Sequence, residues 1–175
     1  GMFTNKTGST TCESCYSGHF SNSTAECHPC PAGYYSYSMS TACTECESGS
    51  YANTTGNYMC TNCVAGTYAN GTANTECIEC AAGTYSQYDG SGACTECYYG
   101  MFTNKTGSTT CESCYSGHFS NSTTECHPCP AGYYSYSTST VCSSCEAGYY
   151  SERAAGYCTS CDAGYVSSAN ASECT

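Results

Sequence analysis

The stretch CYSGHFSNSTAEC, residues 15–27, contains the pattern that decides the fold of this chain. Three residues after Cys15 comes Gly18, an aromatic residue follows at Phe20, and the stretch closes on Cys27. Glycine permits the positive φ of a tight turn at no steric cost, and aromatic side chains are typical of extended segments. We therefore expect a turn at Gly18 and a short strand directly after it.

The same pattern recurs along all 175 residues. Ten Cys-x-x-Cys pairs are separated by 11 to 13 residues, so each module is 15 to 17 residues long. A second period lies above the first, because residues 1–50 match residues 100–149 with only seven differences. The domain organisation we expect is a tandem array of about ten cysteine modules over 1–175, in which six modules form a 99-residue super-repeat (1–99) and 100–175 is a partial copy.

Both ends of the sequence fall inside a module. Gly1 aligns with Gly100, which lies three residues after Cys97, and Cys174 would open a further Cys-x-x-Cys pair. We therefore expect this chain to be a segment of a longer array.

The composition excludes a conventional hydrophobic core. The chain has no leucine, one isoleucine, three valines and four phenylalanines, against 21 cysteines and 19 tyrosines. Cysteine at this level indicates a disulfide scaffold. The expected fold class is therefore small disulfide-rich repeats: an elongated, solenoid-like rod of short β-hairpins and turns with almost no helix, in which each module contacts only its neighbours. The aromatic residue after each glycine should cover the neighbouring disulfide as a substitute core.

The charge and the missing motifs exclude several function classes. The formal net charge is −11, with only three lysines and arginines, so we expect no binding to nucleic acid. No apolar run is long enough for a membrane span, and we expect no membrane contact within this segment. No catalytic constellation occurs, so we expect neither an enzyme nor a metal or other cofactor. The Cys-His-Pro-Cys segments at 27–30 and 126–129 are interpreted as tolerant linkers, because other modules hold unrelated residues in the same place.

Asparagine carries the signal for the cellular compartment. Ten asparagines in a chain that is about 30% serine and threonine should give about three Asn-x-Ser/Thr acceptors by chance, yet there are seven, and six lie four residues after the glycine of their module. N-linked glycan implies the secretory route, which oxidises thiols, so we expect an extracellular or cell-surface chain with disulfides rather than zinc thiolates. The expected glycosylation sites are Asn5, Asn22, Asn53, Asn70, Asn104, Asn121 and Asn170.

The residues alone leave two disulfide pairings open. The second cysteine of each pair can join the first of the next pair, and each such loop would contribute about 3 kcal/mol in the chain-entropy model. Alternatively, first cysteines can join first cysteines and second join second, as in Cys12 to Cys27 and Cys15 to Cys30.

The unit C-x-x-G-x-[YF] closed by a cysteine, as in residues 15–27, resembles the single-disulfide A-type module of tumour necrosis factor receptors. Its tandem form, C-x-x-C-x-A-G-x-Y-S, is similar to ephrin-receptor-like cysteine-rich repeats and to C-x-x-C-rich surface proteins of protists. The resemblance favours the sequential pairing of the cysteines. The implied disulfides are Cys15–Cys27, Cys30–Cys43, Cys46–Cys60, Cys63–Cys77, Cys80–Cys94, Cys97–Cys111, Cys114–Cys126, Cys129–Cys142, Cys145–Cys158 and Cys161–Cys174.

We interpret the function as structural: an extracellular glycoprotein that is the building block of a filament, surface appendage or coat. Near-identical duplication lengthens a rod without adding a site, and the glycan acceptors follow the repeat. The expected partners are further copies of the chain, through self-association into a fibre or lateral rod contacts, and glycans. The alternative is a cell-surface, receptor-like ectodomain or surface antigen that binds a protein ligand.

Overall fold

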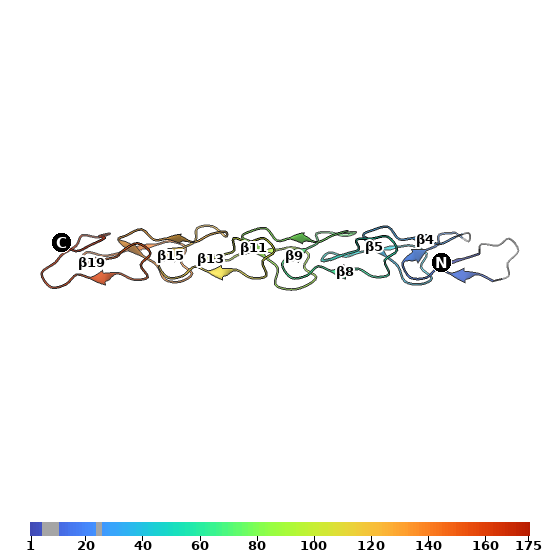
Figure 1. Ribbon diagram of the computed structural model, residues 1–175, viewed down its shortest axis with the longest axis horizontal. Coiled ribbons are helices and arrows are strands. Elements are labelled where there is room, and N and C mark those ends of the chain that lie inside the picture. The colour runs from blue at the N-terminus through green and yellow to red at the C-terminus, as the bar shows by residue number, and fades with distance from the viewer. Residues whose placement is uncertain (5–10, 24–25) are drawn as a thin grey trace. The chain divides into compact units, whose positions relative to one another are not determined.

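The computed structural model describes residues 1–4, 11–23 and 26–175 (Figure 1). The contacts within it divide the chain into two compact units. Unit 1 contains residues 1–80 and 86–94, and unit 2 contains residues 81–85 and 95–175. Both units are built from the same module, so one description of the module serves for each.

Ten antiparallel hairpins with two residues in each strand make up the regular structure, and the described residues contain no helix. The first strands are β1 (Met2–Phe3), β3 (His19–Phe20), β5 (Tyr34–Tyr35), β7 (Ser50–Tyr51), β9 (Thr67–Tyr68), β11 (Thr84–Tyr85), β13 (Met101–Phe102), β15 (His118–Phe119), β17 (Tyr133–Tyr134) and β19 (Tyr149–Tyr150). Their partners are β2 (Glu13–Ser14), β4 (His28–Pro29), β6 (Thr44–Glu45), β8 (Thr61–Asn62), β10 (Ile78–Glu79), β12 (Thr95–Glu96), β14 (Glu112–Ser113), β16 (His127–Pro128), β18 (Ser143–Ser144) and β20 (Thr159–Ser160). Disulfide-rich repeats of short hairpins, almost without helix, are confirmed.

A tight turn precedes each first strand, as the glycine spacing predicts. In the module that begins at Cys63, the N–H of Thr67 donates to the carbonyl of Val64 at 3.0 Å, and Gly66 has a φ of 86°. A positive φ at the third position of a four-residue turn is the type II geometry, which needs glycine there. The hydroxyl of Thr67 donates to the same carbonyl at 2.7 Å and reinforces the turn.

The two residues inside each Cys-x-x-Cys pair form the second strand of a hairpin. Their interpretation as a linker is therefore wrong: Thr67 pairs with Glu79 and Tyr68 with Ile78, and the other hairpins pair in the same way. Both side chains are exposed in eight of these ten strands. Since only the backbone is held there, the side chains can vary without changing the pairing.

Cysteines and small residues form the buried centre of the modules. Nine second cysteines are at most 6% exposed: Cys15, Cys30, Cys46, Cys63, Cys80, Cys97, Cys114, Cys129 and Cys145. The residue after the aromatic position is at most 7% exposed in Ser21, Ser36, Ala52, Ala69, Ser86, Thr103, Ser120, Ser135 and Ser151. The aromatic residues that we expected to act as a substitute core are only half-buried. A small side chain is needed in this column because neighbouring backbones approach it closely.

Ten disulfides run along the chain, from Cys15–Cys27 to Cys161–Cys174. Each joins the second cysteine of one Cys-x-x-Cys pair to the first cysteine of the next, which is the sequential pairing. The Cα atoms of the two cysteines lie 5.6 to 5.8 Å apart, within the normal range. Among the described residues Cys12 is the one cysteine outside a disulfide, and it is exposed.

Hydrogen bonds join each module to the next in a repeated scheme. In unit 2, the N–H of Gly117 donates to the carbonyl of Ser135 at 2.8 Å, and the N–H of Ser135 donates onward to the carbonyl of Ala155 at 3.2 Å. The Ser135 hydroxyl donates back to the carbonyl of His118 at 2.9 Å. The buried serine is thus fully bonded to the modules on both sides, as a buried polar group must be.

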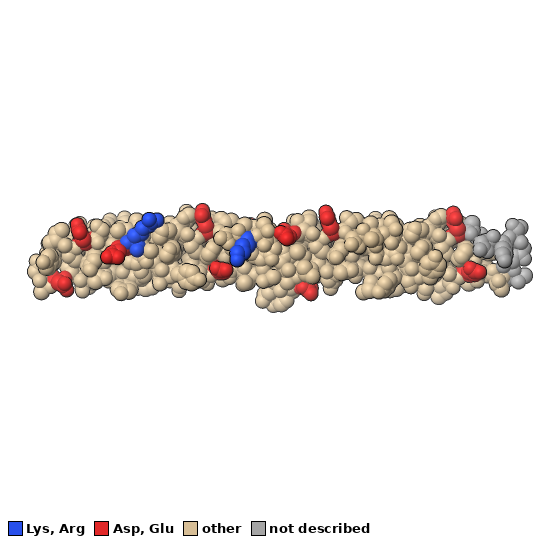
Figure 2. All heavy atoms as spheres, viewed as in Figure 1, with Lys and Arg blue, Asp and Glu red and all other residues tan. Residues whose placement is uncertain are grey.

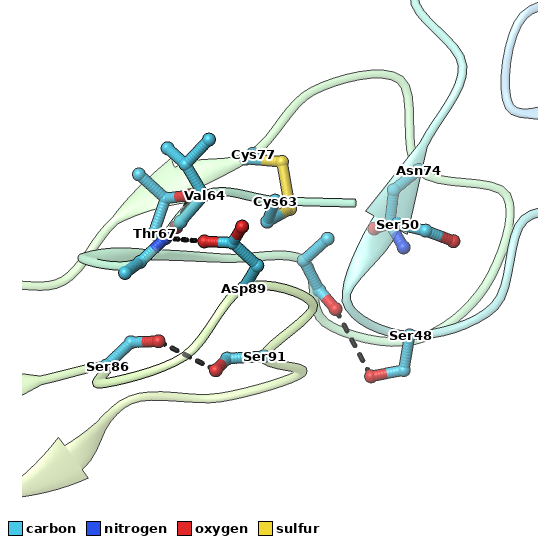
Figure 3. Close-up of a disulfide and its surroundings, with 12 residues drawn as sticks. Ser48, Ser50, Cys63, Val64, Thr67, Asn74, Cys77, Ser86, Asp89 and Ser91 are labelled. Carbon is cyan, nitrogen blue, oxygen red and sulfur yellow. Dashed lines mark hydrogen bonds between the residues drawn. A yellow bond between two sulfur atoms is a disulfide. The ribbon is translucent and has the colours of Figure 1, made fainter. Parts of the chain in front are cut away.

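Side chains add further bonds around the disulfides of unit 1, as Figure 3 shows for Cys63–Cys77. The carboxylate of Asp89 accepts the N–H of Ala65 at 2.8 Å. The hydroxyls of Ser86 and Ser91 are bonded to each other at 2.7 Å. The Asp89 bond joins two neighbouring modules and the Ser86–Ser91 bond braces one module, so polar contacts act where most folds use apolar side chains.

The turn glycines also approach a more distant module, so the expectation that each module contacts only its neighbours is wrong. A Cβ atom on Gly117 would collide with the carbonyl oxygen of Ala154, which lies two modules further along the chain. In unit 1, Gly18 has the same relation to Gly56. The absence of a side chain lets the backbones touch in both cases, so the modules of Gly18 and Gly117 are each packed against two successors.

Candidate functional site

Titratable side chains form no metal-binding cluster in the part of the chain that the structure describes. No group of three or more His, Cys, Asp or Glu residues could hold a metal ion there. His28 lies 3.5 Å from Glu26, and His127 lies 3.5 Å from Glu125, but all four side chains are at least 39% exposed. Exposed contacts of this kind contribute little to stability, even when the histidine is protonated.

The glycan acceptor asparagines lie at the surface. Asn22, Asn53, Asn70, Asn104, Asn121 and Asn170 are exposed, while Asn5 lies outside the described residues. An exposed side chain is what a bulky glycan requires in the folded chain. Glycosylation at these positions stays a prediction.

Tyrosine replaces the acceptor asparagine in one module of each super-repeat copy. The position four residues after the turn glycine is Tyr37 in unit 1 and Tyr136 in unit 2. Each ring packs edge-on against the aromatic residue of its own first strand, Tyr35 or Tyr134, with ring centroids 5.6 Å apart. Edge-to-face pairs are a preferred aromatic geometry. These two modules therefore present paired rings where six other modules present an acceptor for sugar.

In unit 2 the paired rings form part of a groove of about 300 Å³, which we call the tyrosine groove. It is lined by Tyr134, Tyr136, Ser144, Glu146, Tyr149, Tyr157 and Cys158. Tyr136 and Tyr157 are 66% and 71% exposed, so the groove is open to a partner. Aromatic faces beside a carboxylate attract a cation.

Acidic side chains outnumber basic ones on the face shown in Figure 2, in agreement with the net charge of −11. The groove has Glu146 as its one ionised lining residue. A cationic partner would therefore be attracted by the Glu146 carboxylate and, at longer range, by the net negative charge of the chain.

A second groove of about 600 Å³ lies in unit 1 and has a different character. It is lined by Tyr51, Asn53, Thr61, Asn62, Val64, Thr67, Thr75, Glu76 and Cys77. Its lining is mainly polar, and it contains the acceptor Asn53. A glycan on Asn53 would therefore cover this groove, whereas no acceptor lines the tyrosine groove.

Comparison with known families adds to this geometry. Residues 66–114 match the family described as tyrosine-protein kinase ephrin type A/B receptor-like. The chain is a cysteine-rich repeat protein that resembles ephrin-receptor-like modules. The matched module is a repeat of the receptor-ectodomain type, not a catalytic domain, and together with the disulfides it suggests an extracellular domain. No curated protein matches the chain. Over the described residues, no helix has the length and apolar character that crossing a membrane requires.

Two features of the site were not predicted from the sequence. The small residue after each aromatic position is serine, alanine or threonine in every module, and this restriction could have revealed the buried column. The tyrosine groove combines side chains from two modules, Tyr134 and Tyr136 from one, Tyr149 and Tyr157 from the next. No pattern within a single module indicates it.

Proposed function

We propose that this chain is part of an extracellular, receptor-like ectodomain that binds a protein ligand. The match of residues 66–114 to ephrin-receptor-like repeats carries the proposal. The disulfides support it, because they stabilise a chain without a conventional core in an oxidising compartment. In this role the modules act as a scaffold that presents lateral surfaces, with no cofactor other than covalent glycans.

The ligand segment that fits the tyrosine groove carries arginine or lysine. Four tyrosines and the carboxylate of Glu146 line this groove, and aromatic rings and carboxylates both attract cations. A cation over an aromatic ring contributes about 0.5 to 2 kcal/mol, depending on how far it is desolvated. Position 136 holds tyrosine, so no N-glycan starts there to block access.

The test uses the secreted, oxidised chain and a synthetic nine-residue peptide with two central arginines, compared with the same peptide containing citrulline. Binding should shift the NMR signals of Tyr136 and Tyr157 for the arginine peptide alone. Replacing both Tyr136 and Tyr149 by serine should weaken binding by about 5- to 30-fold. Tyr37→Ser is the matched control, because Ser50 stands in the unit 1 copy where unit 2 has Tyr149. Equal binding of the two peptides would refute this assignment of the ligand.

A building block of a filament, surface appendage or coat remains the second candidate function. The near-identical 99-residue duplication favours it, because it multiplies modules without changing them. Self-association would then be the main activity. Sedimentation of the secreted chain, with electron microscopy, separates the two proposals: ordered polymers that form without a ligand favour the filament, and a stable monomer favours the ectodomain.

A further inference from the structure

An open groove of about 860 Å³ in unit 2 combines exposed aromatic rings with a glycan acceptor. It is lined by residues 96–99, 120–123 and Thr140. Tyr98 and Tyr99, which we call the tyrosine floor, are 71% and 91% exposed. Asn121, which begins the acceptor Asn-Ser-Thr, lines the same groove and is itself exposed. The asparagine that would carry a sugar and two exposed rings therefore line the same groove.

Both sides of this groove are held in place by the backbone. The floor belongs to a tight turn that the N–H of Met101 closes on the carbonyl of Tyr98 at 2.9 Å, next to the Cys97–Cys111 disulfide. At the acceptor, the Thr103 N–H donates to the Thr123 carbonyl at 3.0 Å, which holds the last residue of the Asn-Ser-Thr sequence. The geometry of floor and acceptor therefore exists before any sugar is attached.

The acceptor loop has its own support. The hydroxyl of Ser120, which is 3% exposed, shares its one hydrogen between the carbonyl of Glu125, at 2.7 Å, and the carbonyl of Ser122. These bonds close the loop on itself around residue 121. The Asn121 side chain is thus carried by a short, braced segment.

We propose that Asn121 carries an N-linked glycan whose first sugars lie along the tyrosine floor. In the attachment step, the side-chain Nδ2 of Asn121 forms a bond to the anomeric carbon of N-acetylglucosamine. The bond from that carbon to a lipid-linked diphosphate breaks, the lipid diphosphate leaves, and the amide proton passes to a base of the transferase. The donor is a lipid diphosphate-linked oligosaccharide of the secretory pathway, so this inference rests on the extracellular placement proposed above.

The groove suits a sugar better than it suits a peptide. The C–H face of a pyranose ring packs on an aromatic face, and the amphipathic tyrosine leaves its hydroxyl free for the sugar's polar edge. In the lining, the Glu96 carboxylate can accept hydrogen bonds from sugar hydroxyls, and the Thr140 hydroxyl can both donate and accept them. Packing also removes from water two ring surfaces that are otherwise uncovered.

The chain contains its own control at Asn104. This acceptor occupies the same position in the preceding module, in a cavity of about 260 Å³ lined by 102–110 and Glu112. Its lining contains one aromatic residue, the half-buried Phe102, but no exposed pair of rings, and the preceding turn has Ala81 and Ala82 where the other site has Tyr98 and Tyr99. A glycan on Asn104 therefore lacks the floor and should be free in solvent.

The experiment compares glycan release at the two sites in the whole chain, secreted from a glycosylating eukaryotic host and kept folded. Peptide N-glycosidase should release the Asn121 glycan about five- to tenfold more slowly than the Asn104 glycan, the size expected for packing on aromatic rings. The double substitution Tyr98→Ala and Tyr99→Ala should raise the Asn121 rate to that of Asn104. This variant copies the natural Ala81-Ala82 turn, and an unchanged non-reducing disulfide map verifies that it folds. An N-acetyl methyl signal at Asn121 should lie upfield in the parent and return to its ordinary position in the variant.

Every outcome decides the proposal. Equal release rates in the parent, or a slow Asn121 rate that survives the double substitution, would overturn it. A bare Asn121 beside a glycosylated Asn104 would also overturn it and leave the extracellular placement intact. If both asparagines are bare, the glycan inference and its secretory premise fall together. Binding of the arginine peptide to the tyrosine groove is measured separately, so loss of the ligand assignment is distinguishable from loss of the glycan.

Discussion

Alanine at Gly117 should destabilise unit 2 by two separate effects. Gly117 has a φ of 80°, and an L-residue in this left-handed region costs about 1–2 kcal/mol. The new Cβ would also strike the carbonyl oxygen of Ala154, and overpacking of this kind costs a further amount of about 1–3 kcal/mol. Gly117→Ala should therefore lower the free energy of unfolding by about 2–5 kcal/mol in total.

Gly148→Ala is the matched control for this prediction. Gly148 occupies the same turn position with a φ of 85°, but its Cβ would meet no atom within 4 Å. This variant should lose only the conformational cost of about 1–2 kcal/mol. Urea unfolding with disulfides intact, followed by tyrosine fluorescence, gives both values, and hydrogen exchange at the Ala154 N–H reports the local contact. Equal losses in the two variants would refute the argument that modules two apart are in contact.

Three further predictions address other parts of the module. Ser135→Ala removes the hydroxyl bond to the His118 carbonyl and should cost about 0.5–1.5 kcal/mol in urea unfolding, and a value near zero would contradict the role of the buried serine. Thr138→Gly should stabilise the chain by about 0.5–1 kcal/mol, because Thr138 has a φ of 62° that glycine adopts without strain; a lower melting temperature would argue against this. Replacing Cys114 and Cys126 together by serine should cost about 3 kcal/mol, and full stability of that variant would show that the disulfide ladder is not what replaces a core.

The turn and the short strand of each module could be predicted from the sequence because single residues impose them. Gly18, and each glycine like it, is restricted by its φ, and Phe20 marks the strand that follows. The disulfide framework could also be predicted, because cysteines in an oxidised chain form disulfides and their spacing can be read directly from the sequence. Local constraints of this kind leave a trace in the residue types.

The second strands, the buried small residues and the contacts between modules depend on how the modules pack together, so the residue types indicate them only weakly. The second strands vary from His28–Pro29 to Ile78–Glu79, because their backbones pair and their side chains mostly face solvent. Ala69 and Ser135 both fill the buried position that accepts only a small side chain. One is apolar and the other polar, so a search for apolar residues would not find this position. The contact of Gly117 with Ala154 depends on how successive modules are stacked, and no single residue type indicates that arrangement.

The hydrogen bonds between modules have a consequence for how such a chain can evolve. The recurring backbone links join a fixed position of one module to a fixed position one or two modules later. Recombination that inserts a whole number of modules therefore gives each new junction a complete set of partners, as the placing of Cys111 on the position of Cys12 illustrates. An insertion of any other length would leave backbone N–H groups without acceptors and cysteines without disulfide partners at the new junction. The chain can thus lengthen or shorten by whole modules and still fold. The exposed side chains of each module can meanwhile change in evolution.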